Sequence, residues 1–206
     1  AAHFVPLDVV QEESWQAAVA ATVEKFGALH GLLNAAGVGV RNSIEDCTLA
    51  EYRRVNDINS LGTFLGCKNA VRVMKQPGRA NGRSGGSIIC TASNAGLVTE
   101  PIVGLPYMPA KAGVLHMVRA LGLELAEFRI RINAIAPGPF VTNIGGGWLK
   151  KDPVARKAWD AIVPLGAVAE TEQLKPLALL LASDASDYMT GSHVVIDGGM
   201  MLGKFQ

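Results

Sequence analysis

A tyrosine and a lysine four residues apart, Tyr107 and Lys111, are the pair in this sequence whose side chains could form one acid/base unit. In a helix this spacing places both side chains on one face, about one turn apart. A free tyrosine has a pKa of about 10, so it exchanges protons poorly near neutrality unless a positive charge favours its phenolate. Lys111 could supply that charge. The same spacing occurs by chance in many surface helices, so the pair indicates chemistry only together with its surroundings.

Two hydrophobic runs rich in β-branched residues lie on either side of this pair along the chain. Residues 87–93 predict a buried strand that carries the Ser93 hydroxyl at its end. Residues 130–136 predict a second buried strand, which Pro137 and Gly138 terminate. A serine at such a position is more often a loop hydroxyl than a catalytic residue, so the interpretation of Ser93 depends on the other motifs in the sequence.

The motifs of this chain and their order resemble those of the classical short-chain dehydrogenase/reductase family. The matching segments are, in order, Asn34-Ala35-Ala36-Gly37, Asn59, Ser93, Tyr107 with Lys111, Pro137-Gly138-Pro139-Phe140-Val141-Thr142 and Ile196-Asp197-Gly198-Gly199. They are similar to the family's NAAG motif, its catalytic tetrad, its cofactor-contacting PGxxxT segment and its C-terminal strand and turn. The resemblance covers essentially all 206 residues.

The resemblance implies hydride transfer between a nicotinamide cofactor and a secondary alcohol or ketone, with Asn59, Ser93, Tyr107 and Lys111 as catalytic residues. A carbonyl oxygen gains negative charge when hydride arrives, so Tyr107 would give it a proton and Ser93 would donate a second hydrogen bond. Lys111 would favour the phenolate and hold the ribose hydroxyls. Asn59 would hold a water that relays protons from Lys111. The alternative is that Asn59 is a polar helix residue that hydrogen-bonds to solvent or to a nearby backbone carbonyl.

The same resemblance implies a set of cofactor-binding residues: Asp8, Asn34, Ala35, Ala36, Gly37, Tyr107, Lys111, Pro137, Gly138 and Thr142. The small residues of the NAAG motif would let a ribose lie against the backbone. Asp8 would contact the adenine amine, or it is simply a strand-end or turn aspartate. Thr142 would meet the nicotinamide carboxamide. NAD is the expected cofactor and NADP the alternative, because the segment that normally decides between them follows a strand not seen in this sequence.

Strand and helix patterns alternate along the chain. This predicts an α/β fold with a Rossmann-like, doubly wound parallel sheet between two helical layers. The predicted strands lie near residues 3–9, 31–35, 87–93, 130–136 and 193–196, and the predicted helices near 13–26, 49–74, 107–126, 153–162 and 171–183. Residues 77–86 predict a polar surface loop. Because proline is tolerated only in the first turn of a helix, Pro109 requires the helix with Lys111 to begin at Tyr107, after a loop closed by Pro106.

One expected segment is missing from the start of the sequence. Dinucleotide folds hold pyrophosphate in a glycine-rich turn between the first strand and helix. The chain instead opens in a segment that resembles the family's third strand, so we expect about 50–60 further N-terminal residues that form a βαβα part. Without that part, the predicted strand at residues 3–9 has no neighbour. The later run Gly145-Gly146-Gly147 does not stand at a strand-to-helix junction of that kind, so it predicts a flexible loop.

Composition bounds the class of protein. A length of 206 residues and 49% hydrophobic content fit one domain, residues 1–206, with a sizeable core. A net charge of +1 offers no basic stripe for nucleic acid, and neither a membrane-spanning run nor a signal peptide is seen. Cys47, Cys67 and Cys90 lack metal-binding or disulfide spacing, so we expect no metal and buried thiols in a cytoplasmic protein.

The segment at residues 143–165 is expected to be a substrate lid, hinged at its three glycines. Its Trp148, Trp159, Ile144 and Leu149 predict a mostly apolar secondary alcohol or ketone rather than a sugar. The alternative is that these side chains merely pack the lid onto the core. We also expect a homodimer or homotetramer, because residues 112–126 form a predicted helix that is apolar nearly all round and would pack, beside residues 49–74, on a second subunit.

Two other function classes remain open. One is a regulator that kept the fold, senses the cofactor and lost turnover. The other is an enzyme of the same family with different chemistry, such as an epimerase or dehydratase.

Overall fold

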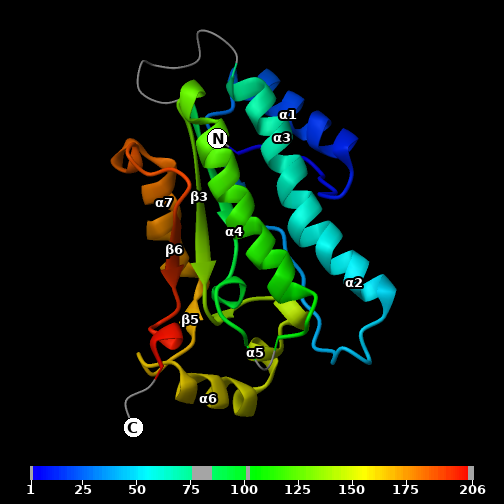
Figure 1. Cartoon of the computed structure of the whole chain (residues 1–206). Helices are drawn as coiled ribbons and strands as arrows, with labels where there is room; N and C mark the ends of the chain where they lie inside the picture. The colour runs from blue at the N-terminus through cyan, green and yellow to red at the C-terminus, as the bar shows by residue number, and fades with distance from the viewer. Residues whose placement is uncertain (1, 76–84, 101–102, 204–206) are drawn as a thin grey trace.

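The computed structural model describes residues 2–75, 85–100 and 103–203 (Figure 1). Its helices and strands are α1 (Glu12–Phe26), β1 (Gly31–Asn34), α2 (Leu49–Asn56), α3 (Gly62–Met74), β2 (Gly86–Thr91), α4 (Tyr107–Glu124), β3 (Ile130–Pro137), β4 (Phe140–Val141), α5 (Trp148–Lys151), α6 (Pro153–Ile162), β5 (Ala169–Glu170), α7 (Lys175–Ala182) and β6 (His193–Ile196). A π-helical turn, η1 (Asp57–Leu61), joins α2 to α3 without a break. The 3-10 turn η2 (Asn94–Gly96) follows β2, and the 3-10 turn η5 (Thr171–Leu174) precedes α7.

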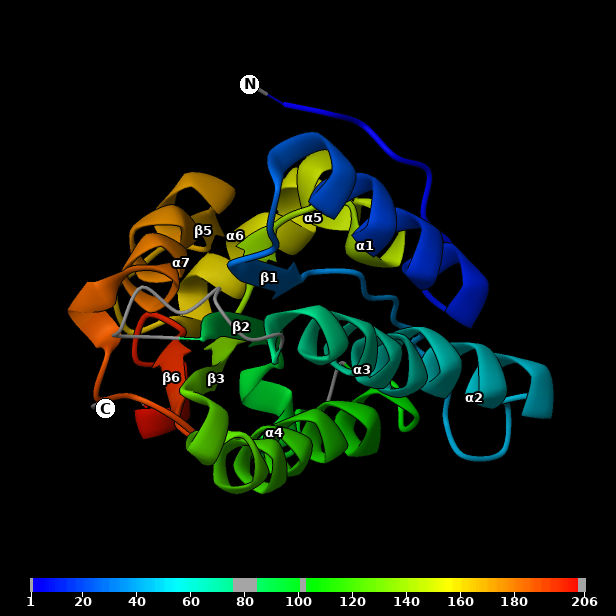
Figure 2. The same cartoon turned by 90° about the horizontal axis from the view of Figure 1, so that it is seen from above.

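The central sheet has four parallel strands in the order β1-β2-β3-β6. Helices α3 and α4 cover one of its faces and α7 covers the other, which gives three α/β/α layers (Figure 2). Helix α1 packs against α3. This is the Rossmann-like, doubly wound arrangement that the alternation of strand and helix patterns predicted.

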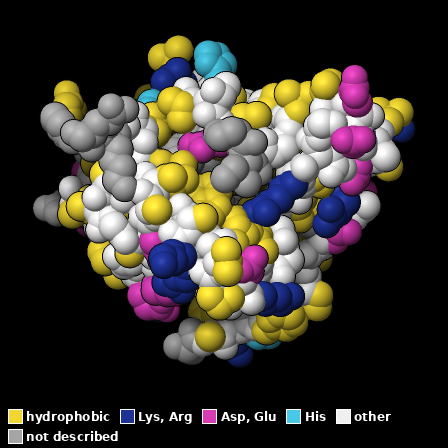
Figure 3. All heavy atoms as spheres, turned by 90° about the horizontal axis from the view of Figure 1, so that it is seen from below, with side chains coloured by type: hydrophobic (Ala, Val, Ile, Leu, Met, Phe, Trp, Pro, Cys, Tyr) yellow, Lys and Arg dark blue, Asp and Glu magenta, His cyan; other side chains and the backbone are white. Residues whose placement is uncertain are grey.

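The carboxyl ends of the parallel strands meet at one edge of the sheet, at the bottom of Figure 1. Figure 3 shows the molecule from that side: hydrophobic side chains gather in the middle of the face, and Lys and Arg side chains lie beside them. Open α/β sheets bind their ligands at this edge. The functional residues are therefore expected there.

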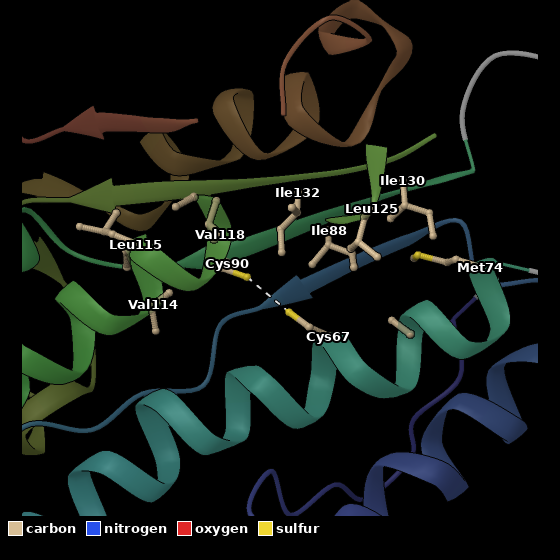
Figure 4. Close-up of a cluster of buried hydrophobic side chains, with 13 residues drawn as sticks. Cys67, Met74, Ile88, Cys90, Val114, Leu115, Val118, Leu125, Ile130 and Ile132 are labelled. Carbon is tan, nitrogen blue, oxygen red and sulfur yellow. Dashed lines mark hydrogen bonds between the residues drawn. The ribbon is translucent and has the colours of Figure 1, made fainter. Parts of the chain in front are cut away.

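Strand β2 carries three consecutive apolar residues, Ile88, Ile89 and Cys90, and both of its faces are buried. Successive side chains of a strand point to opposite faces, and in a parallel sheet both faces are covered. Ile88 and Cys90 accordingly join the core between the sheet and helices α3 and α4 (Figure 4), whereas Ile89 packs with Leu181 of α7. Cys67 of α3 faces Cys90, with the two sulfur atoms 3.8 Å apart.

Most predicted elements form with boundaries shifted by a few residues. Helix α4 begins at Tyr107 after Pro106, as Pro109 required, and residues 49–74 are helical throughout, although η1 widens the helix midway. The helix predicted at residues 171–183 divides into η5 and α7. Of the loop predicted at residues 77–86, residues 77–84 lie outside the described part of the chain.

Two predictions are wrong. Residues 2–8 form no strand, and Phe4 is 86% exposed, because no other described segment pairs with them and a strand needs a neighbour for its backbone hydrogen bonds. Cys47 is only half-buried, on the loop before α2, whereas Cys67 and Cys90 are buried as expected.

In the part of the chain that the structure describes, no helix has the length and apolar character needed to cross a membrane.

Candidate active site

A cavity of about 800 Å³ opens at the carboxyl ends of the strands. The predicted site residues among those that line it are Ala35, Gly37, Ser93, Tyr107, Lys111, Pro137, Gly138 and Thr142. They come from the segments after β1, β2 and β3 and from the start of α4. Cavities of this size hold drug-sized ligands, so it has room for the reacting ends of two molecules.

Tyr107 and Lys111 occupy the first turn and the second turn of α4 and face the same cavity. Lys111 is 2% exposed, and its Nζ donates a hydrogen bond to the Thr91 carbonyl at 2.7 Å. The same Nζ lies 5.6 Å from the centroid of the Tyr107 ring. The end of β2 therefore anchors the ammonium, and α4 places the phenol beside it.

The protonation of this pair differs from what the sequence predicts. Burial lowers the pKa of Lys111 from 10.5 to about 8. Burial also raises the pKa of Tyr107, while a hydrogen bond with Ser93 acts in the opposite direction. The expectation that Lys111 lowers the pKa of Tyr107 is thus not met, because desolvation raises this pKa and the effect that opposes it comes from Ser93. The protein by itself holds Tyr107 as a neutral phenol.

Ser93 lies two residues after the end of β2 and is the N-cap residue of η2. Its Oγ accepts a hydrogen bond from the Ala95 amide at 3.2 Å and donates one to Asn94 Oδ1 at 3.3 Å. Asn94 Nδ2 donates in turn to Glu100 Oε1 at 3.3 Å. Burial, and then the charge of Asp197, raise the pKa of Glu100. A buried carboxyl thus stands two hydrogen bonds from Ser93.

Asn59 lies in η1, where the helix widens. Its Nδ2 donates to the carbonyls of Val38 and Val55, both at 2.8 Å. The bond to Val55 occupies the carbonyl four residues back, which accounts for the π-helical turn at this position. Asn59 Oδ1 is buried and has no hydrogen-bond partner among the described residues. A buried unpaired acceptor is costly, so it marks a position suited to a bound hydroxyl or water.

Gly37 keeps open the space beside that acceptor. A Cβ added at Gly37 would lie 3.0 Å from Asn59 Oδ1 and 3.5 Å from Lys111 Nζ. An acceptor and a donor thus border one small volume next to a glycine. This donor set suits the hydroxyl groups of a ribose, so the residues present fit a nicotinamide nucleotide, with Lys111 and Gly37 beside its sugar and Thr142 farther along the cavity.

Three predicted cofactor residues, Asn34, Ala36 and Asp8, do not line the large cavity. Asn34 is buried, and its Nδ2 donates to the sulfur atoms of Cys67 and Cys90 at 3.6 and 3.7 Å, so it braces the end of β1. Asn34 and Ala36 line a smaller cavity of about 190 Å³. The Asp8 carboxylate accepts from the Val10 amide at 3.1 Å, which is the geometry of a turn aspartate.

The segment after β3 is closely packed against the C-terminal turn. A Cβ at Gly138 would lie 2.6 Å from Asp197 Cβ, so only glycine fits there. Asp197 receives the amides of Gly199 and Met201 at 2.9 and 2.8 Å and thereby fixes that turn. Thr142 Oγ1 accepts from the Ile144 amide at 3.2 Å and lies at the cavity wall.

Residues 143–165 form a 3-10 turn and helices α5 and α6 over the cavity. Its three glycines all have positive φ, a region that favours glycine. Trp148 and Trp159 meet edge to face at 5.9 Å and pack with Leu149. The sequence also predicts that Ile102 adds apolar surface beside Ser93, and this residue lies outside the described part of the chain.

Sequence reasoning missed three charged residues at this cavity, Arg41, Glu100 and Lys175. None belongs to a recognisable motif, and Arg41 and Glu100 lie on loops whose paths depend on the whole fold. In the described ranges, no group of three or more His, Cys, Asp or Glu side chains could hold a metal ion.

Comparisons with known proteins agree with this geometry. A family model described as Enoyl-(Acyl carrier protein) reductase matches residues 1–201. Trans-4-hydroxycyclohexanecarboxylate dehydrogenase of Sinomonas cyclohexanicum is 42% identical over 203 residues, which are 98% of this chain and 72% of that protein. 3-alpha-(or 20-beta)-hydroxysteroid dehydrogenase of Mycobacterium tuberculosis (strain H37Rv) is 38% identical over the same shares of the two chains.

A solved structure gives the same result. The crystal structure of a short-chain type dehydrogenase/reductase from Mycobacterium marinum matches with a TM-score of 0.87 at 32% identity, covering 95% of this chain and 74% of that one. The chain therefore belongs to the short-chain dehydrogenase/reductase family and is an NAD(P)-dependent oxidoreductase.

Proposed function

We propose that this enzyme interconverts a cyclic or otherwise mostly apolar secondary alcohol and the corresponding ketone, with Tyr107 as the general acid and base. The observation that carries the proposal is the half-buried Tyr107 phenol, which its raised pKa keeps neutral, beside the ammonium of Lys111 in one large cavity that Ser93 also lines. A bound nicotinamide supplies the hydride in one direction and accepts it in the other.

In the reductive direction Tyr107 gives its proton to the carbonyl oxygen as the hydride reaches the carbonyl carbon. The raised pKa of Tyr107 keeps that proton in place until charge develops on the oxygen. Ser93 donates a second hydrogen bond to the same oxygen, for which its hydroxyl proton turns away from Asn94 Oδ1 while the Ala95 amide keeps its Oγ in place. In the oxidative direction Tyr107 accepts the proton of the alcohol, which requires added positive charge close to its phenolate.

Lys111 and Asn59 would return the proton to solvent. With a pKa of about 8, Lys111 can lose and regain a proton near neutrality. A water bonded to Asn59 Oδ1 would accept a proton from Lys111 through the space beside Gly37. We propose NAD as the cofactor, held by the NAAG segment, Lys111 and Thr142, and assays with NAD and NADP in parallel test this choice.

The substrate class follows from the lid, residues 143–165, which we propose closes over the cavity. Trp148, Trp159 and Leu149 present aromatic and aliphatic surface there, with few groups able to bond a polyol. The two relatives reported above are named for hydroxyl groups on a cyclohexanecarboxylate and on a steroid. Both observations support a carbon-ring substrate rather than a sugar.

We further propose a cytoplasmic homodimer or homotetramer. Leu123 of α4 is 85% exposed, and Phe64 of α3 and Leu61 of η1 are 45% and 39% exposed. Helix α4 lies next to α2 and α3 on the same side of the sheet in both cartoon views (Figures 1 and 2). A second copy related by a two-fold axis would cover this apolar face with the same face of its own.

Tyr107→Phe should lower turnover by about 10²–10⁴-fold, because the positioned proton donor is lost, and leave cofactor affinity nearly unchanged. The matched control is Tyr188→Phe, since Tyr188 is fully exposed. Steady-state rates and cofactor titration measure both effects. Near wild-type turnover in Tyr107→Phe would end the assignment.

Lys111→Met should abolish most activity and weaken cofactor binding, yet make the fold more stable at pH 7. Because the pKa of Lys111 falls from 10.5 to about 8 on folding, the unfolded chain binds more protons between these values. The contribution of Lys111 to the free energy of unfolding therefore rises between about pH 8 and 10.5. Below about pH 8 the buried ammonium destabilises the fold by its full amount. Removing the buried charge should add on the order of 1–3 kcal/mol at pH 7.

Urea unfolding of wild type and Lys111→Met, measured between pH 7 and 10.5, gives the test. The stability advantage of the variant should shrink as the pH rises, and Lys157→Met, at an exposed lysine of α6, should show no such advantage. A variant less stable than wild type at pH 7 would contradict the buried-charge account.

The substrate class is tested by comparing kcat/KM for cyclohexanol-type alcohols with that for sugar alcohols and aldoses. Each buried methylene should add about 0.8 kcal/mol to transition-state binding. We expect alicyclic alcohols to be preferred by at least about tenfold, equivalent to about 1.4 kcal/mol. A preference for polyols would show that the lid tryptophans only pack the lid onto the core.

Light scattering at micromolar concentration should show a dimer or tetramer. Leu123→Glu should shift the protein toward monomer, because it places a charge in the apolar interface. The matched change Leu165→Glu, at an 84% exposed leucine away from α4, should not. A wild-type monomer at this concentration would refute the assembly.

A further inference from the structure

Four charged side chains line the large cavity: Arg41, Glu100, Lys111 and Lys175. Three of them have a protein partner. Lys111 donates to the Thr91 carbonyl, Lys175 pairs with Glu172 at 3.4 Å, and Glu100 accepts from Asn94.

Arg41 differs from the other three. Among the described residues it has no carboxylate within salt-bridge distance and no hydrogen-bond acceptor for its guanidinium. Its contact is with the lid: the central guanidinium carbon lies 3.5 Å from the centroid of the Trp148 ring. A positive charge therefore faces the cavity, and none of its donors is used by the residues that the structure describes.

The stacking on Trp148 prepares Arg41 for one kind of ligand. A guanidinium that rests over an aromatic ring uses its flat face, which leaves its N–H groups directed outward in the plane. Two parallel N–H groups in that plane match the two oxygens of a carboxylate. The tryptophan also removes freedom from the long side chain, so less ordering remains to be done on binding.

The backbone places Arg41 close to the reacting end of the cavity. Gly39, two residues earlier, lies against the Tyr107 ring, since a Cβ there would be 3.8 Å from Tyr107 Cδ2. The Val40 carbonyl accepts from the Gly104 amide at 2.9 Å, which fixes the segment. Two residues of chain span at most about 7 Å. A ring-sized molecule can therefore bridge Tyr107 and Arg41.

We propose that Arg41 binds a carboxylate carried by the substrate, at the end of the molecule opposite the hydroxyl or carbonyl that meets Tyr107. The substrate class is then a hydroxy acid or oxo acid with an apolar ring between its two polar ends. This inference rests on the proposed function, because it names the substrate of the same site. Glu100, the carboxylate at the same cavity, lies beyond salt-bridge distance of Arg41 and accepts a hydrogen bond from Asn94.

The test compares 4-hydroxycyclohexanecarboxylate with its neutral amide, 4-hydroxycyclohexanecarboxamide, which has nearly the same shape. Oxidation of each is measured as kcat/KM with NAD and NADP, in wild type, Arg41→Gln, Arg41→Lys and the control Lys175→Gln, which removes a charge that is already paired. In wild type we expect the carboxylate to be preferred by about 10–100-fold, the usual range for a charged hydrogen-bonded pair. Arg41→Gln should abolish that preference mainly through KM, leaving the amide within about twofold. Arg41→Lys should retain part of it and Lys175→Gln all of it.

Each other outcome has a distinct meaning. If wild type oxidises both compounds equally well, this inference fails and the proposed function stands. If Arg41→Gln impairs both compounds to the same extent, Arg41 only holds Trp148 and the lid, and the inference again fails. If wild type oxidises neither of these nor any other alicyclic alcohol, the proposed function itself fails.

Discussion

The burial of Lys111 is the constraint on which the rest of the site depends. Its ammonium is held within the protein by one short hydrogen bond to the Thr91 carbonyl, and the depressed pKa of about 8 records the cost of desolvation. The helix keeps the charge there because neighbouring side chains of α4, including Val114 and Val118, are fixed in the core. Burying Lys111 lowers the stability of the fold, but it also places a group that titrates near neutrality next to Tyr107.

Close backbone approach makes that arrangement possible. A Cβ at Gly96 would lie 2.8 Å from the Lys111 carbonyl carbon, so the turn that carries Ser93 can touch α4 only because residue 96 is glycine. On the other side of Lys111, Gly37 leaves space beside Asn59, because a Cβ there would lie 3.0 Å from Asn59 Oδ1. Glycines thus flank the catalytic lysine on both sides, and the π-helical turn carries Asn59.

The sequence predicts well whatever depends on local rules. Pro109 fixed the start of α4 at Tyr107, and hydrophobic periodicity located the strands of the sheet. The strand expected at residues 3–9 fails because a strand depends on its neighbours as much as on its own residues. The places of Arg41 and Glu100 at the cavity depend on loops with no local signature. The Tyr107 pKa was misjudged because charge can be read from residue types, whereas burial cannot.

The central claim is that burial holds Tyr107 neutral and that added positive charge from the oxidised cofactor releases its proton. Its most direct test is a tyrosinate absorbance titration, taken as the difference between wild type and Tyr107→Phe, with and without oxidised nicotinamide cofactor. The account predicts that Tyr107 ionises above the ordinary tyrosine pKa in the protein alone and that the cofactor moves this ionisation downward. An ordinary tyrosine titration that the cofactor leaves unchanged would contradict it.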